Sequence, residues 1–217
     1  MALLKRARRA VCWATLLVGV TRSAHAESFV SLDSALAQSF PGARVERRTL
    51  ALSVADVKAV EKRARARCDT RLVTAYVAWR GDTLAGAAYT DRRVVRTREA
   101  TLLVSVAPDT TIARIDVLGF FEPPDYRPPA RWLDRLRGRG AGAALAPGRD
   151  VPAIAGASLT SRAVTESARL ALAWHALLLV PELARRHGSG GLPQPRRSPE
   201  TRASGTAPES HRVPSPS

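Results

Sequence analysis

The chain contains only two cysteines, Cys12 and Cys68, and no C-x-x-C-H motif. Cys12 lies in an amino-terminal segment that we expect to be removed, so the mature chain cannot form an intramolecular disulfide. The missing motif excludes covalent haem, and the lack of paired cysteines gives no indication of zinc or iron–sulfur ligation. Aromatic residues account for 5 % of the chain, which leaves few platforms on which bases or sugars could stack.

Lysine is scarce as well, because Lys5, Lys58 and Lys62 are the only lysines among 34 basic residues. The formal net charge of +15 therefore rests on arginine, and much of it is concentrated at the two ends of the chain. Residues 27–184 keep +6 of this charge, an ordinary surplus for a soluble domain. Nucleic-acid binding depends on clustered cations that neutralise phosphates, so we expect no nucleic-acid partner.

Nucleophilic catalysis lacks its usual residues. No serine of the mature domain has a histidine and an acidic partner that would activate it, so we expect no hydrolase and no catalytic residue in this chain. His175 is the one histidine inside a predicted helix. A lone histidine in that position is typical of core packing rather than of metal ligation.

The amino terminus has the pattern of a cleavable secretion signal. A cationic segment at 5–9 precedes an uninterrupted, weakly apolar run at 10–20, and Ala24-His25-Ala26 places small residues at the cleavage positions. The run is shorter than the about 20 residues that a bilayer-crossing helix needs. We therefore expect residues 1–26 to be a signal peptide and the protein to be periplasmic or extracytoplasmic, with an uncleaved membrane anchor as the alternative.

Hydrophobic periodicity predicts an α+β domain with a mainly antiparallel, twisted sheet flanked by helices. Segments of period two, separated by short turns, predict successive hairpins. The predicted strands are 43–52, 72–79, 83–95, 100–106 and 111–121. The predicted helices are 31–40, 53–67, a short one around Trp132, and 160–186, and Ser53 and Asp56 resemble a capping box.

The last predicted helix has an apolar face and a charged face. The residues expected to face inward are Val164, Ala168, Ala171, Trp174 and Leu178, and those expected to face outward are Arg162, Glu166 and Arg169. Residues 187–217 are rich in proline, serine and arginine and contain no hydrophobic set that could fold, so we predict a disordered tail. The folded part is then a single domain at 27–186.

Gly86 and its small neighbours leave a bare patch on a predicted strand. This patch has two interpretations, which the sequence alone leaves open. It marks a β-bulge, or it gives a flat ring room to lie close to the backbone.

One short stretch, Gly156-Ala157-Ser158-Leu159-Thr160-Ser161, combines small and hydroxyl-bearing residues at the start of the last helix. A helix start presents unpaired amide groups and a partial positive charge, so it favours an anion. The stretch has neither a Walker lysine nor a G-x-G-x-x-G motif. The residues alone therefore fit a phosphate site, or simply a helix capped by Ser158 or Thr160.

This stretch resembles the (S/T)-G-A-(S/T)-x-(S/T) motif of the FMN-binding domain family. That family includes the flavin-bearing extracytoplasmic subunits of sodium-pumping NADH:quinone oxidoreductases and of Rnf complexes, together with stand-alone exported flavoproteins. The resemblance implies FMN as the cofactor of a domain at 27–186. It also implies that the cofactor is bound by Gly156, Ala157, Ser158, Leu159, Thr160 and Ser161.

The resemblance also implies how the cofactor is attached. In many members the final hydroxyl residue of the motif is esterified to the phosphate of FMN by a separate, FAD-dependent flavin transferase, and in this chain that residue is Thr160. Ala155 stands where the family usually has serine or threonine, and Asp150 lies two positions upstream of the usual acidic residue.

Four further residues of the region similar to the family have two possible roles. They border the flavin ring, or they close a loop and pack the sheet. These residues are Glu122, Asp125, Tyr126 and Trp132.

Three functions follow as hypotheses. The first is an exported redox carrier in an electron-transport system, with FMN on Thr160 exchanging electrons with membrane or periplasmic partners, rather than a stand-alone enzyme. The second is a periplasmic module that binds FMN or another phosphorylated ligand noncovalently, as a sensor or assembly factor. The third is an exported scaffold without a cofactor, whose basic tail contacts anionic lipid or acidic partners.

Overall fold

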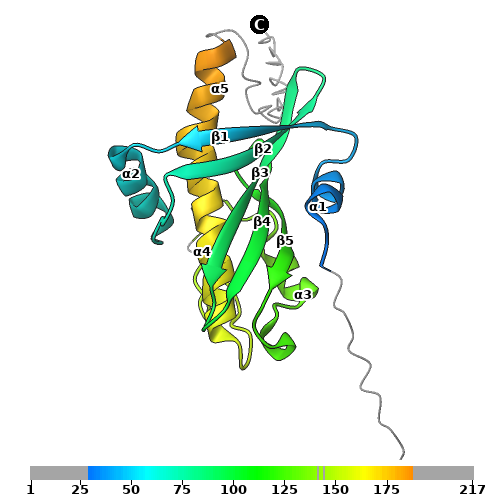
Figure 1. The fold of residues 1–217 in the computed structure, drawn as a ribbon, viewed down its shortest axis with the longest axis vertical. Coiled ribbons are helices and arrows are strands. Elements are labelled where there is room, and N and C mark those ends of the chain that lie inside the picture. The colour runs from blue at the N-terminus through cyan, green and yellow to red at the C-terminus, as the bar shows by residue number, and fades with distance from the viewer. Residues whose placement is uncertain (1–28, 141, 144, 188–217) are drawn as a thin grey trace, which may run out of the picture.

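The computed structural model describes residues 29–140, 142–143 and 145–187 (Figure 1). The expected signal peptide and the tail beyond residue 187 lie outside this part of the chain. The helices are α1 (Leu32–Ser39), α2 (Val54–Ala64), α3 (Ala130–Leu133), α4 (Ser158–Trp174) and α5 (Val180–His187). The strands are β1 (Arg44–Ala51), β2 (Leu72–Arg80), β3 (Thr83–Val94), β4 (Glu99–Val106) and β5 (Ile112–Phe120).

The five strands form one antiparallel sheet in chain order, β1-β2-β3-β4-β5, so each strand pairs with its neighbour in the sequence. This arrangement confirms the predicted α+β fold with an antiparallel sheet. Each predicted strand also lies within one residue of its observed bounds. The predicted capping box of α2 is present, because Ser53 and Asp56 exchange backbone and side-chain hydrogen bonds.

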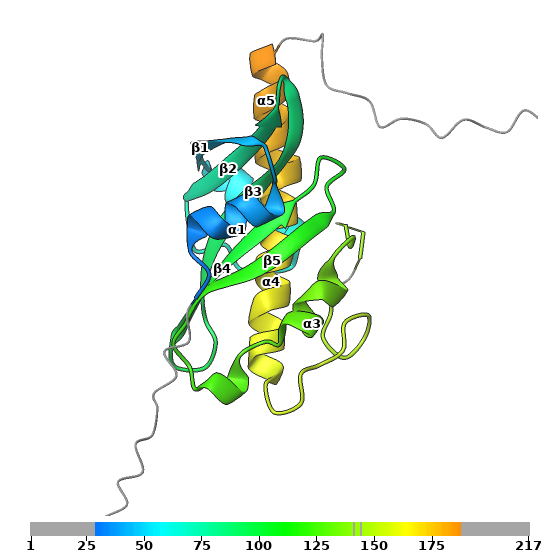
Figure 2. The same ribbon diagram turned by 90° about the vertical axis from the view of Figure 1, so that its right-hand side faces the viewer.

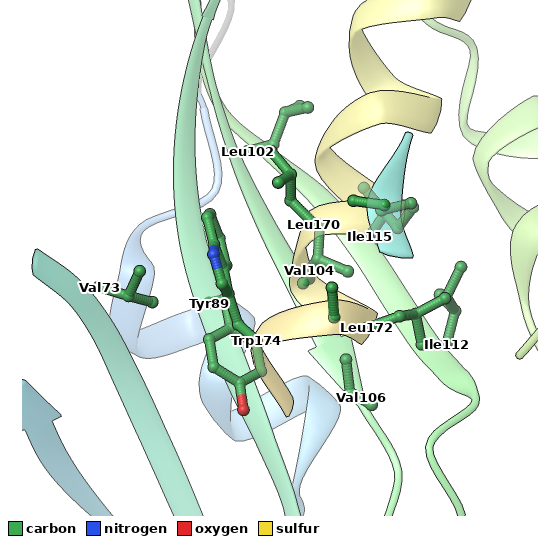
Figure 3. Packing of buried hydrophobic residues seen from close by; sticks show 14 of the residues in the cluster. Val73, Tyr89, Leu102, Val104, Val106, Ile112, Ile115, Leu170, Leu172 and Trp174 are labelled. Atoms are coloured by element: carbon green, nitrogen blue, oxygen red, sulfur yellow. The ribbon is translucent and has the colours of Figure 1, made fainter. Parts of the chain in front are cut away.

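Helices cover both faces of the sheet (Figure 2). The larger hydrophobic cluster lies between the sheet and α4, where Leu102 and Val104 of β4 meet Leu170 and Trp174 (Figure 3). The smaller cluster lies under α1. Helix α4 therefore has one face in the core while its amino-terminal end reaches the edge of the domain.

The predicted inward face of the last helix is correct for Val164, Ala168, Ala171 and Trp174, which are each 2 % exposed or less. Leu178, which lies beyond the end of α4, is partly buried against the same core. The prediction that Arg169 faces outward is wrong. Its guanidinium is partly buried and donates hydrogen bonds to the carbonyls of Ala64, at 2.6 Å, and Leu145, at 2.9 Å. The last carbonyls of a helix need donors, so Arg169 ties the end of α2 to α4.

Gly86 marks a bulge, and a flat ring does lie against it, but that ring belongs to Phe40. The β2–β3 register shifts beside Ala78, which pairs with Gly86. A Cβ atom at Gly86 would lie 2.7 Å from the Phe40 ring and 2.5 Å from the Val106 carbonyl oxygen, and its φ of +143° is one that side chains rarely adopt. The bare patch is therefore occupied by the protein's own α1 end.

A π-helical segment, His175–Leu179, joins α4 to α5. Residues 158–186 form a helical run that is long and apolar enough to cross a membrane, and its most apolar stretch has a mean hydropathy of 1.3. However, 67 % of the most apolar stretch is buried inside the domain, and buried core helices pass the same test of length and composition.

Candidate functional site

Helix α4 begins without a side-chain cap. Its N-cap residue is Ala157, and the preceding Gly156 has a φ of +72°, a left-handed conformation that glycine adopts without strain. The interpretation that Ser158 or Thr160 caps the helix is therefore wrong. The first amide groups of α4 are left to solvent or a ligand, and they carry the partial positive charge of the helix start.

A hollow of about 320 Å³ lies at this helix start. It is lined by residues 156–160 together with Arg96 and Tyr126, and we call it the Thr160 hollow. Five of the six residues predicted from the motif thus come together around one space. The sixth, Ser161, is not part of the lining.

Thr160 lies in the wall of this hollow with its hydroxyl turned toward the protein. The residue is 1 % exposed, and its Oγ1 donates a hydrogen bond of 2.8 Å to the carbonyl of Tyr126. The residue therefore borders the space that a ligand would fill. Its hydroxyl must exchange the Tyr126 carbonyl for another partner before it can react.

The neighbouring hydroxyls have contrasting positions. Ser161 is fully buried, and its Oγ accepts a hydrogen bond from the amide of Ile154 at 3.0 Å and donates to the carbonyl of Ala157 at 3.2 Å. It therefore holds the loop before α4 in place rather than facing the hollow. Ser158 is exposed, and its hydroxyl has no hydrogen-bond partner among the described residues.

Arg96 supplies a cation beside the uncapped helix start. It belongs to the β3–β4 loop, lines the Thr160 hollow, and places its guanidinium 4.6 Å from the centre of the Tyr126 ring. Stacking on an aromatic ring restricts a guanidinium while leaving its N–H groups free to meet an anion. Sequence reasoning missed Arg96, because nothing distinguishes it from the many other arginines.

Glu122 holds the Arg96 loop in place. A single carboxylate oxygen accepts hydrogen bonds from three consecutive amides, those of Arg96 at 2.9 Å, Thr97 at 2.6 Å and Arg98 at 2.8 Å. These amides, led by that of Thr97, hold the pKa of Glu122 below its ordinary value. Of the two roles open for Glu122, the structure supports closing a loop.

The other three residues named with Glu122 lie in different settings. Tyr126 lines the hollow, whereas Asp125 is exposed on the short turn before it. Trp132 is buried and donates from Nε1 to the carbonyl of Pro152 at 2.6 Å, so it packs the loop that leads to α4. Asp150 accepts hydrogen bonds from the amides of Leu145 and Ala146, which places its carboxylate in the loop rather than in the lining of the hollow.

A second hollow adjoins the first and shares Leu159 with it. It measures about 410 Å³ and lies between α4 and the β3–β4 hairpin, with Val95, Glu99 and Arg162 in its lining. We call it the Glu99 hollow. Ligand pockets of proteins typically measure about 300–1,000 Å³, so the two hollows together offer room for a phosphate and a three-ring group.

Metal chemistry has no candidate site in the part of the chain that the structure describes. No three histidine, cysteine, aspartate or glutamate residues gather there in a way that could hold an ion. The arrangement at α4 instead provides amide donors, one free hydroxyl and a guanidinium. These groups fit a phosphate, whose oxygens accept hydrogen bonds from all of them.

Fold and site together define an α+β domain that presents an anion site at the start of its core helix. The sequence profile of the FMN-binding domain family matches residues 96–173, a segment that contains both Arg96 and the whole α4 start. The chain therefore carries an FMN-binding domain, and it is a flavin-binding protein with FMN as its cofactor. A comparison with curated proteins gives no match.

Proposed function

We propose that the phosphate of FMN binds in the Thr160 hollow. The observation that carries this proposal is the meeting of three features at one space: an uncapped helix start, the Arg96 guanidinium and Thr160 in the lining. A helix start and a cation both favour a doubly charged group. Gly156 has open space where a Cβ would stand, so the backbone is accessible there.

The Glu99 hollow supplies the adjoining space for the flavin ring. Leu159 is 46 % exposed and belongs to both hollows, so it offers an apolar surface where the phosphate site passes into the ring site. When FMN is bound, its ring supplies the redox chemistry, and the residues of this chain fix its position.

We further propose that Thr160 forms a phosphodiester with FMN. A flavin transferase would direct the Thr160 oxygen to the FMN phosphorus of FAD, where a new P–O bond forms as the pyrophosphate P–O bond breaks. AMP leaves, and the hydroxyl proton passes to a base of the transferase. The hydrogen bond to the Tyr126 carbonyl must break first, which costs about 0.5–1.5 kcal/mol, a small barrier for a catalysed step.

Attachment of this kind suits an exported electron carrier. Outside the cytoplasm no pool of FMN replaces cofactor that dissociates, so a covalent link retains it. The expected signal peptide at 1–26 supports export. The partners proposed are the transferase and membrane or periplasmic redox proteins. Cell fractionation tests the location, since the proposal expects mature protein that begins after Ala26 outside the cytoplasm.

A noncovalent FMN module is the second candidate, and two observations favour it. The Thr160 hydroxyl is already bonded to the Tyr126 carbonyl, and Ala155 removes one hydroxyl that the family motif usually has. In this reading the hollow holds the phosphate by hydrogen bonds alone, and the protein acts as a sensor or assembly factor.

Acid precipitation distinguishes the two candidates. The protein is produced together with a flavin transferase, precipitated with acid, washed, and its flavin fluorescence is measured in a denaturing gel. Covalent attachment predicts a fluorescent band for the wild type and for Ser158→Ala, and none for Thr160→Ala. Flavin that remains in the supernatant would instead support the noncovalent module.

A further inference from the structure

Another hollow lies where the end of α2 packs beside α4 (Figure 1). Its volume is about 120 Å³. Three arginines, Arg63, Arg65 and Arg169, line it, and its other lining residues are glycine, alanine or leucine. We call it the Arg65 hollow. Because no carboxylate belongs to this lining, the three cations have no counter-ion within the hollow.

These arginines keep donors that the fold does not use. Arg63 and Arg65 are exposed, and neither side chain has an ion pair or a hydrogen bond among the described residues. Arg169 has five N–H donors. Three of them are bonded to the carbonyls of Ala64, Arg65 and Leu145, so two remain. The hollow therefore presents cationic donors from three side chains.

The cations also act unfavourably on one another. Burial is the main cause that holds the pKa of Arg169 below its ordinary value, and the charges of Arg65, Arg162 and Arg93 lower it further. The charge of Glu166 opposes this effect, but Glu166 is ion-paired with Arg162 at 2.9 Å and does not line the hollow. An anion in the hollow would replace repulsion between cations with attraction.

We propose that the Arg65 hollow binds a phosphate group, as the free ion or as part of a small soluble phosphate ester. Guanidinium groups bind phosphate oxygens through paired, charge-assisted hydrogen bonds. Three cations around one space favour a doubly charged phosphate over a singly charged carboxylate. Pockets for drug-sized ligands measure about 300–1,000 Å³, so a hollow of about 120 Å³ suits a compact group rather than a nucleotide or a flavin.

The end of α2 does not oppose an anion at this position. The last carbonyls of a helix carry a partial negative charge, which repels anions. Here the carbonyls of Ala64 and Arg65 accept hydrogen bonds from Arg169. Their charge is compensated within the protein, so the guanidinium groups of Arg63 and Arg65 are left to meet a ligand.

This phosphate site is separate from the proposed flavin site. The Arg65 hollow and the Thr160 hollow share no lining residue. Arg169 follows Thr160 by nine residues of α4, which corresponds to about 13 Å along the helix axis. The proposal therefore holds whether or not FMN is bound.

A nitrogen-15 NMR titration of the FMN-loaded protein tests the proposal. Inorganic phosphate and glycerol 3-phosphate are added at constant ionic strength, with chloride as the reference anion. We expect the Nε–H signals of Arg65 and Arg169 and the amide signal of Ala143 to shift in a saturable way with both phosphates and not with chloride. Shifts confined to the amides of Ser158 and Leu159 would assign the phosphate to the flavin site and overturn the proposal. A response to vesicles of phosphatidic acid but not to glycerol 3-phosphate would overturn the soluble ligand in favour of a lipid headgroup.

Arg65→Gly separates binding from folding. Arg65 is the C-cap of α2 and has a φ of +48°, a left-handed conformation that glycine adopts without strain. The variant should therefore unfold at no lower urea concentration than the wild type, yet bind phosphate about tenfold more weakly. Lys62→Gln is the matched control, because it removes a positive charge from α2 outside the lining and should leave the affinity nearly unchanged. Equal losses in the two variants would indicate an adventitious ion only and overturn the proposal.

Discussion

The two ends of α4 hold hydrogen-bonding groups in opposite settings. At the amino-terminal end, the first amides and the Ser158 hydroxyl are open to solvent and lie beside Arg96. At the carboxyl-terminal end, Trp174 and His175 are 1 % and 0 % exposed, and each has a ring nitrogen without a partner in the described residues.

The difference shows how one helix separates binding from stability. Water can satisfy the open end until a ligand replaces it, so changes there should affect ligand affinity and leave folding nearly unchanged. Water has little access to the buried end, so changes there should affect the free energy of unfolding.

The largest effect is expected for Trp174→Ala at the buried end. Removal of a large aromatic side chain from a packed core costs about 3–5 kcal/mol of unfolding free energy. Leu159→Ala, at a side chain that is 46 % exposed at the open end, should cost less than about 1 kcal/mol. Urea denaturation measures both, and equal losses would contradict the comparison.

The second effect is the pH dependence of the unfolding free energy that follows from the titration of His175. Burial lowers its pKa from 6.5 to about 4, partly offset by the charge of Asp109. The unfolded chain therefore binds the proton more readily, so stability that is complete above pH 6.5 is lost as the pH falls toward 4, by up to about 3 kcal/mol.

His175→Gln provides the control for this pH dependence. Glutamine does not titrate and can still accept from Tyr89, whose hydroxyl shares a 3.1 Å hydrogen bond with His175 Nδ1. Stability curves measured between pH 4 and 6.5 should therefore be flatter for the variant. An unchanged slope would assign the acid sensitivity to other groups.

The third effect concerns affinity at the open end. Arg96→Ala removes a charge-assisted hydrogen bond, worth about 1.5–3 kcal/mol, so flavin-free protein should bind FMN roughly 10–100-fold more weakly. Arg98→Ala is the matched control, since Arg98 is exposed in the same loop but does not line the hollow. Fluorescence titration measures both, and equal affinities would remove Arg96 from the site.

The smallest effect is expected for Ser161→Ala. Its hydroxyl makes two hydrogen bonds to the loop before α4, so the variant should lose about 1–2 kcal/mol of unfolding free energy. Ser158→Ala, at the unpartnered hydroxyl three residues earlier, should lose almost none. If the two variants prove equally stable, Ser161 does not hold the loop.

The sequence predicted the features that local patterns encode. Strand alternation and the Ser53–Asp56 box depend on neighbouring residues, and the observed elements match them. The motif likewise located the α4 start, where residues 156–160 line one hollow.

Contacts between distant loops could not be predicted in the same way. Arg96 reaches the site because Glu122, 26 residues away, binds its loop, and Thr160 is bonded to a carbonyl 34 residues away. The hydrophobic periodicity of the sequence does not predict these contacts. The outward prediction for Arg169 failed for the same reason, since its partner at Ala64 lies 105 residues away.

Intact mass of the protein produced with a flavin transferase shows whether Thr160 carries a phosphodiester to FMN. We expect the wild type, Ser158→Ala and Thr160→Ser each to gain the mass of one FMN less one water, and Thr160→Ala to gain none. An unmodified wild type, or a modified Thr160→Ala, would contradict the phosphodiester on Thr160.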